Sequence, residues 1–390
     1  MTHIGIDIEQ FVRDPYGSGI QRVLQQLAVQ WPTDLSPADF VAPLDDQGSN
    51  YVLLTPDQAA ALFSLSFRTR DGGQVREQVN AQLAKHAQSA PVVDLGRLLA
   101  LYSAWLLPEV SYLPAVLDRF ELFQKSMPAA IIGYDTLPMT EAANYRFPPG
   151  SIASVSEYFR LLSTADSVIC ISEFARDSIL DRLRRDRSLP TTVVHPGGDH
   201  IDSPRTSQQA SSTRATVGLL RLGTLEQRKL PLEILAAYEE ARDSGAKLEL
   251  TFIGAPSSSN ERINARIRSA VEAGIGVNWI AEADDARVIE ELVNADAFLS
   301  IGIEGFGIPV LEAIALGTPV AYAGIQPAGE IMDGRGARRL EGIDHAELSH
   351  SFIRLADRSY IQQIRAEIQM DSIPRWHDFA RGVCQGVLSA

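Results

Sequence analysis

The stretch that decides the fold is AFLSIGIEGFGIPVLEAIALGTPVAYA, residues 297–323. Its apolar ends, Ala297–Ile301 and Pro319–Ala323, predict two short buried strands. The segment between them, Ile308–Leu316, has the apolar spacing of a helix. A strand, a helix and a second strand in so short a segment predict the βαβ unit of a parallel sheet.

The same alternation continues upstream and predicts a complete domain of parallel strands and covering helices. The expected strands are Val217–Leu222, Leu248–Gly254 and Val277–Ile280, and the expected helices are Pro231–Arg242, about Glu261–Glu272 and Asp285–Asn294.

The first half of the chain repeats this organisation with weaker signals. The expected strands are His3–Ile8, Tyr51–Leu54, Ala130–Gly133, Ser167–Ile171 and Thr192–Val194. Between about residues 56 and 125 the pattern predicts mainly helix. Ser172 is expected to cap a helix from Glu173 to about Leu183.

A polar, Ser/Thr-rich segment, HIDSPRTSQQASSTR at residues 200–214, separates the two halves and predicts a linker. We expect an N-terminal Rossmann-like domain at 1–200, a linker at 201–215 and a C-terminal Rossmann-like domain at 216–372. Residues 373–390 are expected to form a helix that packs back on the N-terminal domain. The predicted fold class is α/β, with two doubly wound domains facing a central cleft, where such sheets bind ligands.

Composition excludes some classes of protein. Lys and Arg number 35 against 49 Asp and Glu, a net charge of −14, which disfavours a nucleic-acid partner. The 2 Cys and 7 His show no metal-ligand spacing, so no metal site is expected. The N-terminus lacks the pattern of a secretory signal, which predicts a cytoplasmic protein.

Two carboxylates flank the start of the helix in the opening stretch. Gly305 and Gly307 allow a ligand to approach the backbone closely, and free amides at a helix start attract anions. Glu304 and Glu312 are well suited to accept hydrogen bonds from sugar hydroxyls. The alternative is that both carboxylates only complement the helix dipole.

A second signal follows the strand Val217–Leu222. The sequence Gly223-Thr224-Leu225-Glu226-Gln227-Arg228-Lys229 puts two cations at the carboxyl end of that strand, just before a helix. Arg228 can hold phosphate oxygens bidentately and Lys229 adds a point charge. Solvated surface cations are the alternative interpretation.

These two segments together resemble the family 4 glycosyltransferases, retaining enzymes of the two-domain GT-B fold. The E-x7-E pattern from Glu304 to Glu312 and the GTLEQRK sequence at 223–229 carry most of the resemblance. The segments Ala165–Ala175, His195–Asp199 and Gly17–Arg22 are similar to further family motifs. The resemblance runs from about residue 3 to about residue 330.

The resemblance implies a role for each candidate residue. Glu304 would contact donor-sugar hydroxyls, Arg228 and Lys229 would neutralise the diphosphate, and Glu312 would hold the nucleotide ribose. The remaining donor contacts would come from the amides of Gly305, Phe306, Gly307 and Ile308, from Thr224, from Ile280 near the base, and from the loop Gly17, Ser18 and Gly19 of the acceptor-side domain.

One position departs from the family pattern. Many members carry His-Asp where this chain has Tyr134-Asp135. Asp135 remains a candidate catalytic residue. Tyr134 could replace only the hydrogen bond of the usual histidine, not its titration, and packing is the alternative role.

The resemblance implies a metal-independent hexosyltransferase without a bound cofactor. Its partners would be a nucleotide-diphosphate sugar, with mannose slightly favoured, and a glycan or lipid-linked acceptor in cell-envelope polysaccharide synthesis. The alternatives are a nucleotide-sugar epimerase or hydrolase on the same fold, and a catalytically degenerate nucleotide-sugar-binding module. Peripheral membrane contact through the cluster Arg182, Arg184, Arg185 and Arg187 stays open, as does the oligomeric state.

Overall fold

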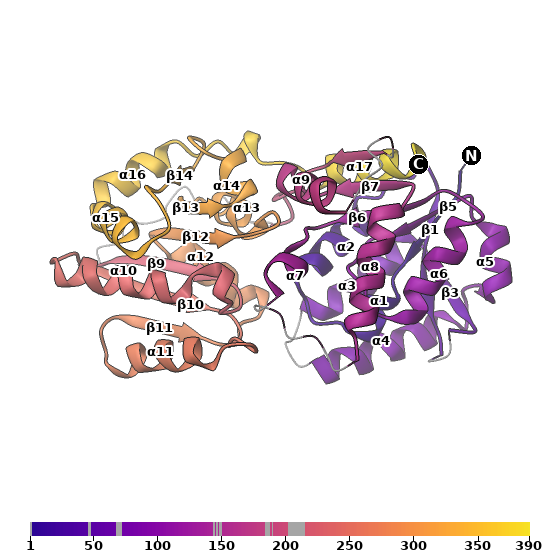
Figure 1. Ribbon diagram of the computed structural model, residues 1–390, viewed down its shortest axis with the longest axis horizontal. Coiled ribbons are helices and arrows are strands. Elements are labelled where there is room, and N and C mark those ends of the chain that lie inside the picture. Colours follow the sequence, from indigo (N-terminus) through magenta and orange to yellow (C-terminus); the bar gives the residue numbers. More distant parts are fainter. Residues whose placement is uncertain are drawn as a thin grey trace. The chain divides into compact units, whose positions relative to one another are not determined.

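The computed structural model of the chain describes residues 2–45, 48–67, 72–142, 145, 147, 150–183, 188, 190–201 and 215–390 (Figure 1). It divides into two compact units, the first made of Met1–Thr136, Phe147–Gly197 and Arg375–Ala390, the second of Leu137–Arg146 and Gly198–Pro374. Residues 137–146, which the domain prediction assigned to the first half, group with the second unit. Most of the predicted linker, and Arg184, Arg185 and Arg187, lie outside the described residues.

An eight-stranded sheet forms the centre of the first unit. Its order is β4 (Val92–Val93), β3 (Tyr51–Leu54), β2 (Ala38–Pro43), β1 (Ile4–Asp7), β5 (Ala104–Leu107), β6 (Ala129–Gly133), β7 (Ser167–Cys170) and β8 (Thr191–Val193). Strands β2, β1 and β5–β8 pair in parallel, whereas β3 pairs antiparallel with β2 and with β4. The strand order reverses between β1 and β5, which makes this the switch point of the sheet.

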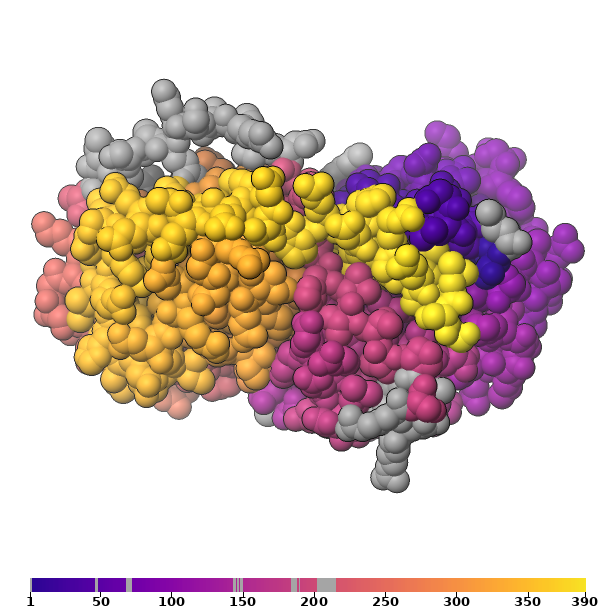
Figure 2. Space-filling model, turned by 90° about the horizontal axis from the view of Figure 1, so that it is seen from above, coloured from indigo at the N-terminus to yellow at the C-terminus, as the bar shows by residue number. Residues whose placement is uncertain are grey.

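Helices pack on this sheet along the whole unit. They are α1 (Glu9–Arg13), α2 (Gly19–Val29), α3 (Pro56–Phe63), α4 (Gly72–His86), α5 (Leu95–Leu101), α6 (Pro114–Gln124), α8 (Ile152–Thr164), α9 (Glu173–Arg182) and α17 (Trp376–Leu388). Helix α17 contacts α2 and strands β5–β7, and Figure 2 shows its yellow residues beside magenta and indigo ones. Trp376, Phe379, Cys384 and Val387 of α17 are buried there.

The second unit contains a fully parallel six-stranded sheet. Its order is β11 (Val277–Ile280), β10 (Leu248–Ile253), β9 (Val217–Leu222), β12 (Ala297–Ile303), β13 (Val320–Ile325) and β14 (Ala337–Arg339). Counted within the unit this is the 3-2-1-4-5-6 order of a Rossmann sheet. Its switch point lies between β9 and β12, where open α/β sheets bind ligands at the carboxyl ends of the strands.

Several of the helices of the second unit bury an apolar core against this sheet. The helices are α7 (Leu137–Thr140), α10 (Pro231–Asp243), α11 (Glu261–Glu272), α12 (Asp285–Asn294), α13 (Ile308–Ala315), α14 (Pro327–Ile331), α15 (His345–Leu355) and α16 (Arg358–Ala366), with 3-10 turns at Gln227–Lys229 (η3) and Met370–Ser372 (η4). Side chains of α10, α11, α15 and α16, among them Tyr238 and Phe352, pack with Leu250 and Phe252 of β10. Among the described residues, none of the helices has the length and apolarity needed to cross a bilayer.

The α/β fold class and its two largely parallel sheets are confirmed. The prediction of mainly helix between residues 56 and 125 was wrong at β4 and β5. Apolar runs as short as Val92–Val93 and Ala104–Leu107 do not distinguish a strand from a helical segment. Strands β2 and β14 were not predicted. The expected cap is confirmed, since the Ser172 hydroxyl accepts a hydrogen bond from the Ala175 amide at 3.0 Å.

Candidate functional site

The ends of β9 and β12 bring two backbone segments into close contact at the switch point of the second unit. Gly302 in β12 has φ +109, and a β-carbon there would collide with the carbonyl oxygen of Arg228. Only glycine accommodates both the backbone angle and this approach. The close contact lets η3, which carries Arg228 and Lys229, lie directly against the end of β12.

Three of the predicted catalytic residues meet at this contact. Arg228 donates to the Glu304 carboxylate at 2.9 Å, and the Lys229 ammonium lies 2.9 Å from the other oxygen of the same carboxylate. Arg228 also donates to the Ile303 carbonyl at 2.6 Å and pairs with Glu226 at 2.7 Å. The side chains of Arg228 and Lys229 are only 12% and 13% exposed, so these ion pairs are shielded from solvent.

A further cation, Arg221, completes this group. It lies on β9, is 3% exposed, and its Nε has no hydrogen-bond partner among the described residues. One of its terminal nitrogens donates to the carbonyl of Leu222. The sequence analysis missed Arg221, although a single arginine inside the apolar run VGLLRL is a detectable signal. We call Arg221, Glu226, Arg228, Lys229 and Glu304 the switch-point cluster.

The charges of the switch-point cluster do not cancel. Burial alone would raise the pKa of Glu304, but Lys229 and Arg228 outweigh it and hold that pKa at about 2. Burial lowers the pKa of Arg221 to about 10. Burial also lowers the pKa of Lys229. The positive charges of Arg228 and Arg221 lower it further, and Glu304 opposes this change. Three cations face two carboxylates, so the cluster has one positive charge in excess and favours an anionic ligand.

The glycine-rich segment after Glu304 leads into helix α13. Gly307 is the N-cap residue, with φ +101, and Ile308 opens the helix ahead of Pro309. Phe306 is 3% exposed and its carbonyl accepts from the Ala328 amide at 2.9 Å, so this side chain packs inward. An amide in the first turn of a helix has no acceptor within that helix, and Ile308, the first residue of α13, follows Glu304 of the cluster by four positions.

The two remaining predicted donor contacts of this unit lie nearby on the same edge of the sheet. Thr224 follows β9, and its carbonyl accepts from the Glu226 amide at 2.8 Å. Ile280 ends β11, and its carbonyl accepts from the Gly254 amide at 2.9 Å. The indole of Trp279 donates to the Gly254 carbonyl and packs against the core, as expected for a structural tryptophan.

Glu312 lies one turn further into α13 and has a partner that the sequence analysis missed. The imidazole Nε2 of His200 is 3.0 Å from Oε1 of Glu312. The two side chains are 5% and 14% exposed. His200 comes from the turn that follows the predicted Gly197-Gly198-Asp199 motif, and 112 positions separate it from Glu312.

The predicted glycine loop, Gly17–Gly19, belongs to the first unit and is largely used for local structure. The amide of Gly17 donates to the side chain of Gln21 at 2.9 Å, and the Ser18 hydroxyl caps α2 by accepting from the Gln21 amide at 3.1 Å. The Gly17 N–H thus has an acceptor in α2, and the donor contact expected of Gly17 stays a prediction. Gly19 is exposed in the first turn of α2, and its role stays a prediction.

Tyr134 and Asp135 follow strand β6 of the first unit. Tyr134 is 5% exposed, and its hydroxyl donates to the Pro108 carbonyl at 2.8 Å. This placement is compatible with the packing role, and a substrate contact of Tyr134 stays a prediction. Asp135 is half-buried near the aromatic rings of Tyr112 and Tyr158.

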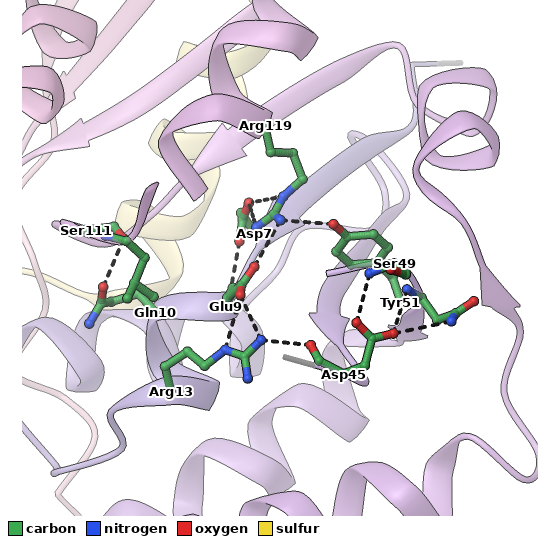
Figure 3. A network of polar contacts seen from close by, with 11 residues as sticks. Asp7, Glu9, Gln10, Arg13, Asp45, Ser49, Tyr51, Ser111 and Arg119 are labelled. Carbon is green, nitrogen blue, oxygen red and sulfur yellow. Dashed lines mark hydrogen bonds and ion pairs between the residues drawn. The ribbon is translucent and has the colours of Figure 1, made fainter. Parts of the chain in front are cut away.

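The switch point of the first sheet contains a buried ionic network. Figure 3 shows Arg119 of α6 between Asp7, Glu9 and Tyr51. Its guanidinium lies 2.7 Å from Asp7 and 2.9 Å from Glu9, and it donates to the Tyr51 hydroxyl at 3.1 Å. Arg119 and both carboxylates have side chains no more than 3% exposed. Sequence reasoning did not predict this network, because its members come from three segments that are far apart in the chain.

Glu109, just after β5, is a second buried carboxyl at this edge. It is 2% exposed and its Oε2 has no hydrogen-bond partner among the described residues. Burial raises its pKa from 4.5 to about 8, against the opposing hydrogen bonds from the Phe11 amide and the Gln21 side chain. Glu109 is therefore protonated in the folded protein at neutral pH.

This pKa predicts that stability falls as the pH rises. Between about pH 4.5 and 8 the folded protein keeps a proton on Glu109 that the unfolded chain releases, so stability is lost on passing through this window. The loss is on the order of 4 kcal/mol. The melting temperature of wild type relative to Glu109→Gln should fall from pH 5 to about pH 8 and then level off. Glu77→Gln, at an exposed position of α4, is the control, and parallel pH profiles for wild type and Glu109→Gln would contradict the prediction.

Comparison with known proteins links this geometry to one family. Residues 151–324 match the model described as "Family 4 Glycosyltransferase in conflict systems". The serotype-specific mannosyltransferase WbdA of Escherichia coli is 25% identical over 224 residues, 52% of this chain and 27% of that protein. The phosphatidyl-myo-inositol mannosyltransferase of Mycobacterium leprae is 23% identical over 213 residues, 53% of this chain and 54% of that one. The chain thus spans between a quarter and about half the length of these relatives.

A solved structure agrees over the whole chain. The Anabaena HepE protein, crystallised in complex with UDP and glucose, superposes with a TM-score of 0.63 at 14% identity and covers 100% of both chains. At this identity the likeness establishes the fold. Among the described residues no group of three or more His, Cys, Asp or Glu side chains is arranged to hold a metal ion.

Proposed function

We propose that this chain is a family 4 glycosyltransferase that transfers a hexosyl unit from a nucleotide-diphosphate sugar to a glycan or lipid-linked acceptor. The match of residues 151–324 to the family 4 model, the similarity to two mannosyltransferases and the GT-B fold support this proposal. We further propose that the anomeric configuration is retained and that no metal ion takes part. A mannosyl donor and a role in cell-envelope polysaccharide synthesis are the favoured details, supported by the names of the two mannosyltransferases that the chain resembles.

The observation that carries the proposal is the switch-point cluster. A buried cluster of side chains with one excess positive charge is unfavourable without a counter-ion. The negative charge of a bound diphosphate would be that counter-ion. The cluster lies at the carboxyl ends of β9 and β12, beside the start of α13, where backbone N–H groups favour phosphate. Cations, helix start and switch point thus favour the same ligand.

The predicted site residues have different roles in this proposal. Arg228 and Lys229 stabilise the negative charge that grows on the diphosphate as the glycosidic bond breaks. Glu304, ionised at any pH above about 2, accepts hydrogen bonds from donor-sugar hydroxyls and fixes the sugar relative to the leaving group. Glu312 binds the ribose hydroxyls, and Asp135 is proposed as a further catalytic residue.

The test is a binding screen followed by a transfer assay. GDP-, UDP-, ADP- and dTDP-sugars are compared by thermal shift, since a ligand of the folded state raises the melting temperature. The donor that binds is then incubated with and without a glycan acceptor, and with and without EDTA. Transfer that needs the acceptor and survives EDTA supports the proposal. Release of free sugar or of an epimer without acceptor would instead support the hydrolase or epimerase alternative, and failure to bind any donor would contradict the proposal.

Lys229→Ala should weaken binding of the donor and of its nucleoside diphosphate. Removal of a desolvated cation from a phosphate site is expected to cost on the order of 10-fold or more in affinity. The matched control is Lys247→Ala, because Lys247 is exposed and lies at the opposite, amino-terminal end of β10. Titration calorimetry with the nucleoside diphosphate measures both. Equal affinities of Lys229→Ala and wild type would exclude Lys229 from the diphosphate site.

A further inference from the structure

The pair His200–Glu312 joins two segments that are distant in the sequence. The turn carrying His200 is tied down at Gly198, whose amide donates to the Pro374 carbonyl at 3.0 Å. A β-carbon on Gly198 would overlap the side chains of Leu311 and Ile373, so glycine allows the turn to lie directly on α13. This packing brings His200 to Glu312, the residue that follows Leu311.

The hydrogen bond constrains which way the Glu312 carboxylate faces. Nε2 of His200 lies 3.0 Å from Oε1. Glu312 is ordinarily an acceptor at both oxygens, so the contact requires a proton on Nε2 and leaves Oε2 to accept from something else. No other hydrogen bond to this carboxylate is found among the described residues, and the side chain is 14% exposed, so a ligand can still reach it.

We propose that His200 is a positioning residue that holds Glu312 in the orientation that binds the nucleotide ribose. The inference rests on the proposed function, in which Glu312 contacts the ribose. A glutamate side chain has three torsions to fix when it binds a ligand, and a carboxylate already held at one oxygen loses less freedom on binding. His200 therefore contributes to affinity only through the ribose hydroxyls, and it does not touch the sugar being transferred.

The experiment compares two nucleotides on each variant. The nucleoside diphosphate among UDP, GDP and ADP that binds wild type best, and its 2′,3′-dideoxy counterpart, are titrated by calorimetry. In His200→Leu, which keeps a buried side chain but has no N–H donor, affinity for the ribonucleotide should fall by about 5- to 10-fold. Affinity for the dideoxy nucleotide should stay within about 2-fold of wild type.

Two further variants separate positioning from folding. His200→Gln places an amide N–H near the position of Nε2 and should restore most of the ribonucleotide affinity. His195→Leu is the matched control, because His195 makes the same type of contact, 2.9 Å from Glu173, in the first unit. It should bind both nucleotides as wild type does.

The outcomes distinguish this inference from the proposed function. Equal losses for the ribose and dideoxy nucleotides in His200→Leu, or no loss for either, would overturn the role of His200 while leaving nucleotide binding intact. If His200→Leu does not fold, the test uses His200→Gln alone. The role of His200 is then overturned if His200→Gln does not prefer the ribonucleotide over the dideoxy nucleotide to the same extent as wild type. Failure of wild type to bind any of the three nucleoside diphosphates would overturn the proposed function together with this inference.

Discussion

Glu304→Gln should transfer sugar on the order of 10²–10³-fold more slowly than wild type while binding the nucleoside diphosphate at least as tightly. The carboxylate accepts from Arg228 and pairs with Lys229, each at 2.9 Å, so its neutralisation leaves both cations available to phosphate. The sugar hydroxyls, in contrast, lose their charged acceptor and the donor is no longer held in its reactive position. The two effects therefore have opposite directions.

Glu226→Gln is the matched control for this variant. Glu226 also pairs with Arg228, at 2.7 Å, and its side chain is 23% exposed against 21% for Glu304. Glu226→Gln removes one negative charge from the switch-point cluster, as Glu304→Gln does, but it leaves the Glu304 carboxylate of the E-x7-E motif in place. Initial rates of transfer and calorimetric titrations of the nucleoside diphosphate are measured on both variants. Equal losses of transfer in both would mean that total charge, rather than the position of Glu304, determines activity.

Arg119→Met should destabilise the first unit by about 3–5 kcal/mol. Arg119 is the cation shared by Asp7 and Glu9, and all three side chains are no more than 3% exposed (Figure 3). Its removal leaves two carboxylates close together in a buried site without a counter-ion. The triple variant Asp7→Asn/Glu9→Gln/Arg119→Met removes these charges as well and should regain most of the lost stability.

Tryptophan fluorescence during urea unfolding suits this measurement. Three of the 4 tryptophans, Trp31, Trp105 and Trp376, lie in the first unit. The control is Arg160→Met, which breaks an exposed pair with Glu157 and should change stability by less than about 0.5 kcal/mol. If Arg119→Met unfolds at the same urea concentration as Arg160→Met, the buried network does not stabilise the unit.

Local patterns predicted some elements to the residue. Helices α11 and α12 and strand β11 have the expected bounds, because their apolar periodicity is complete and the caps Asn260 and Asp284 directly precede the helices. Strand β5 was missed because it becomes a strand through pairing with β1 and β6, which are far from it in the sequence. A pairing of this kind leaves no periodicity in four residues.

The residues of the candidate site also divide into those that local motifs predict and those that depend on long-range contacts. Glu304, Arg228 and Lys229 lie in two recognisable motifs, and the strand order places these motifs side by side. Arg221 and His200 belong to no motif. Their roles follow from burial and from one long-range contact, His200 to Glu312, that depends on how a glycine turn packs on α13. The arginine inside the apolar run VGLLRL is a local signal for Arg221, whereas the sequence contains no local signal for the contact of His200 with Glu312.

The path of the chain between the two units has a consequence for biosynthesis. Helix α17 belongs to the first unit, although Gly198–Pro374 of the second unit precedes it in the chain. A ribosome therefore finishes the whole second unit before it makes the helix that contacts β5, β6 and β7. Until then, apolar surface of these strands is uncovered and is a target for chaperones. Nascent chains halted at residue 374 should bind such chaperones, whereas chains that include α17 should be released.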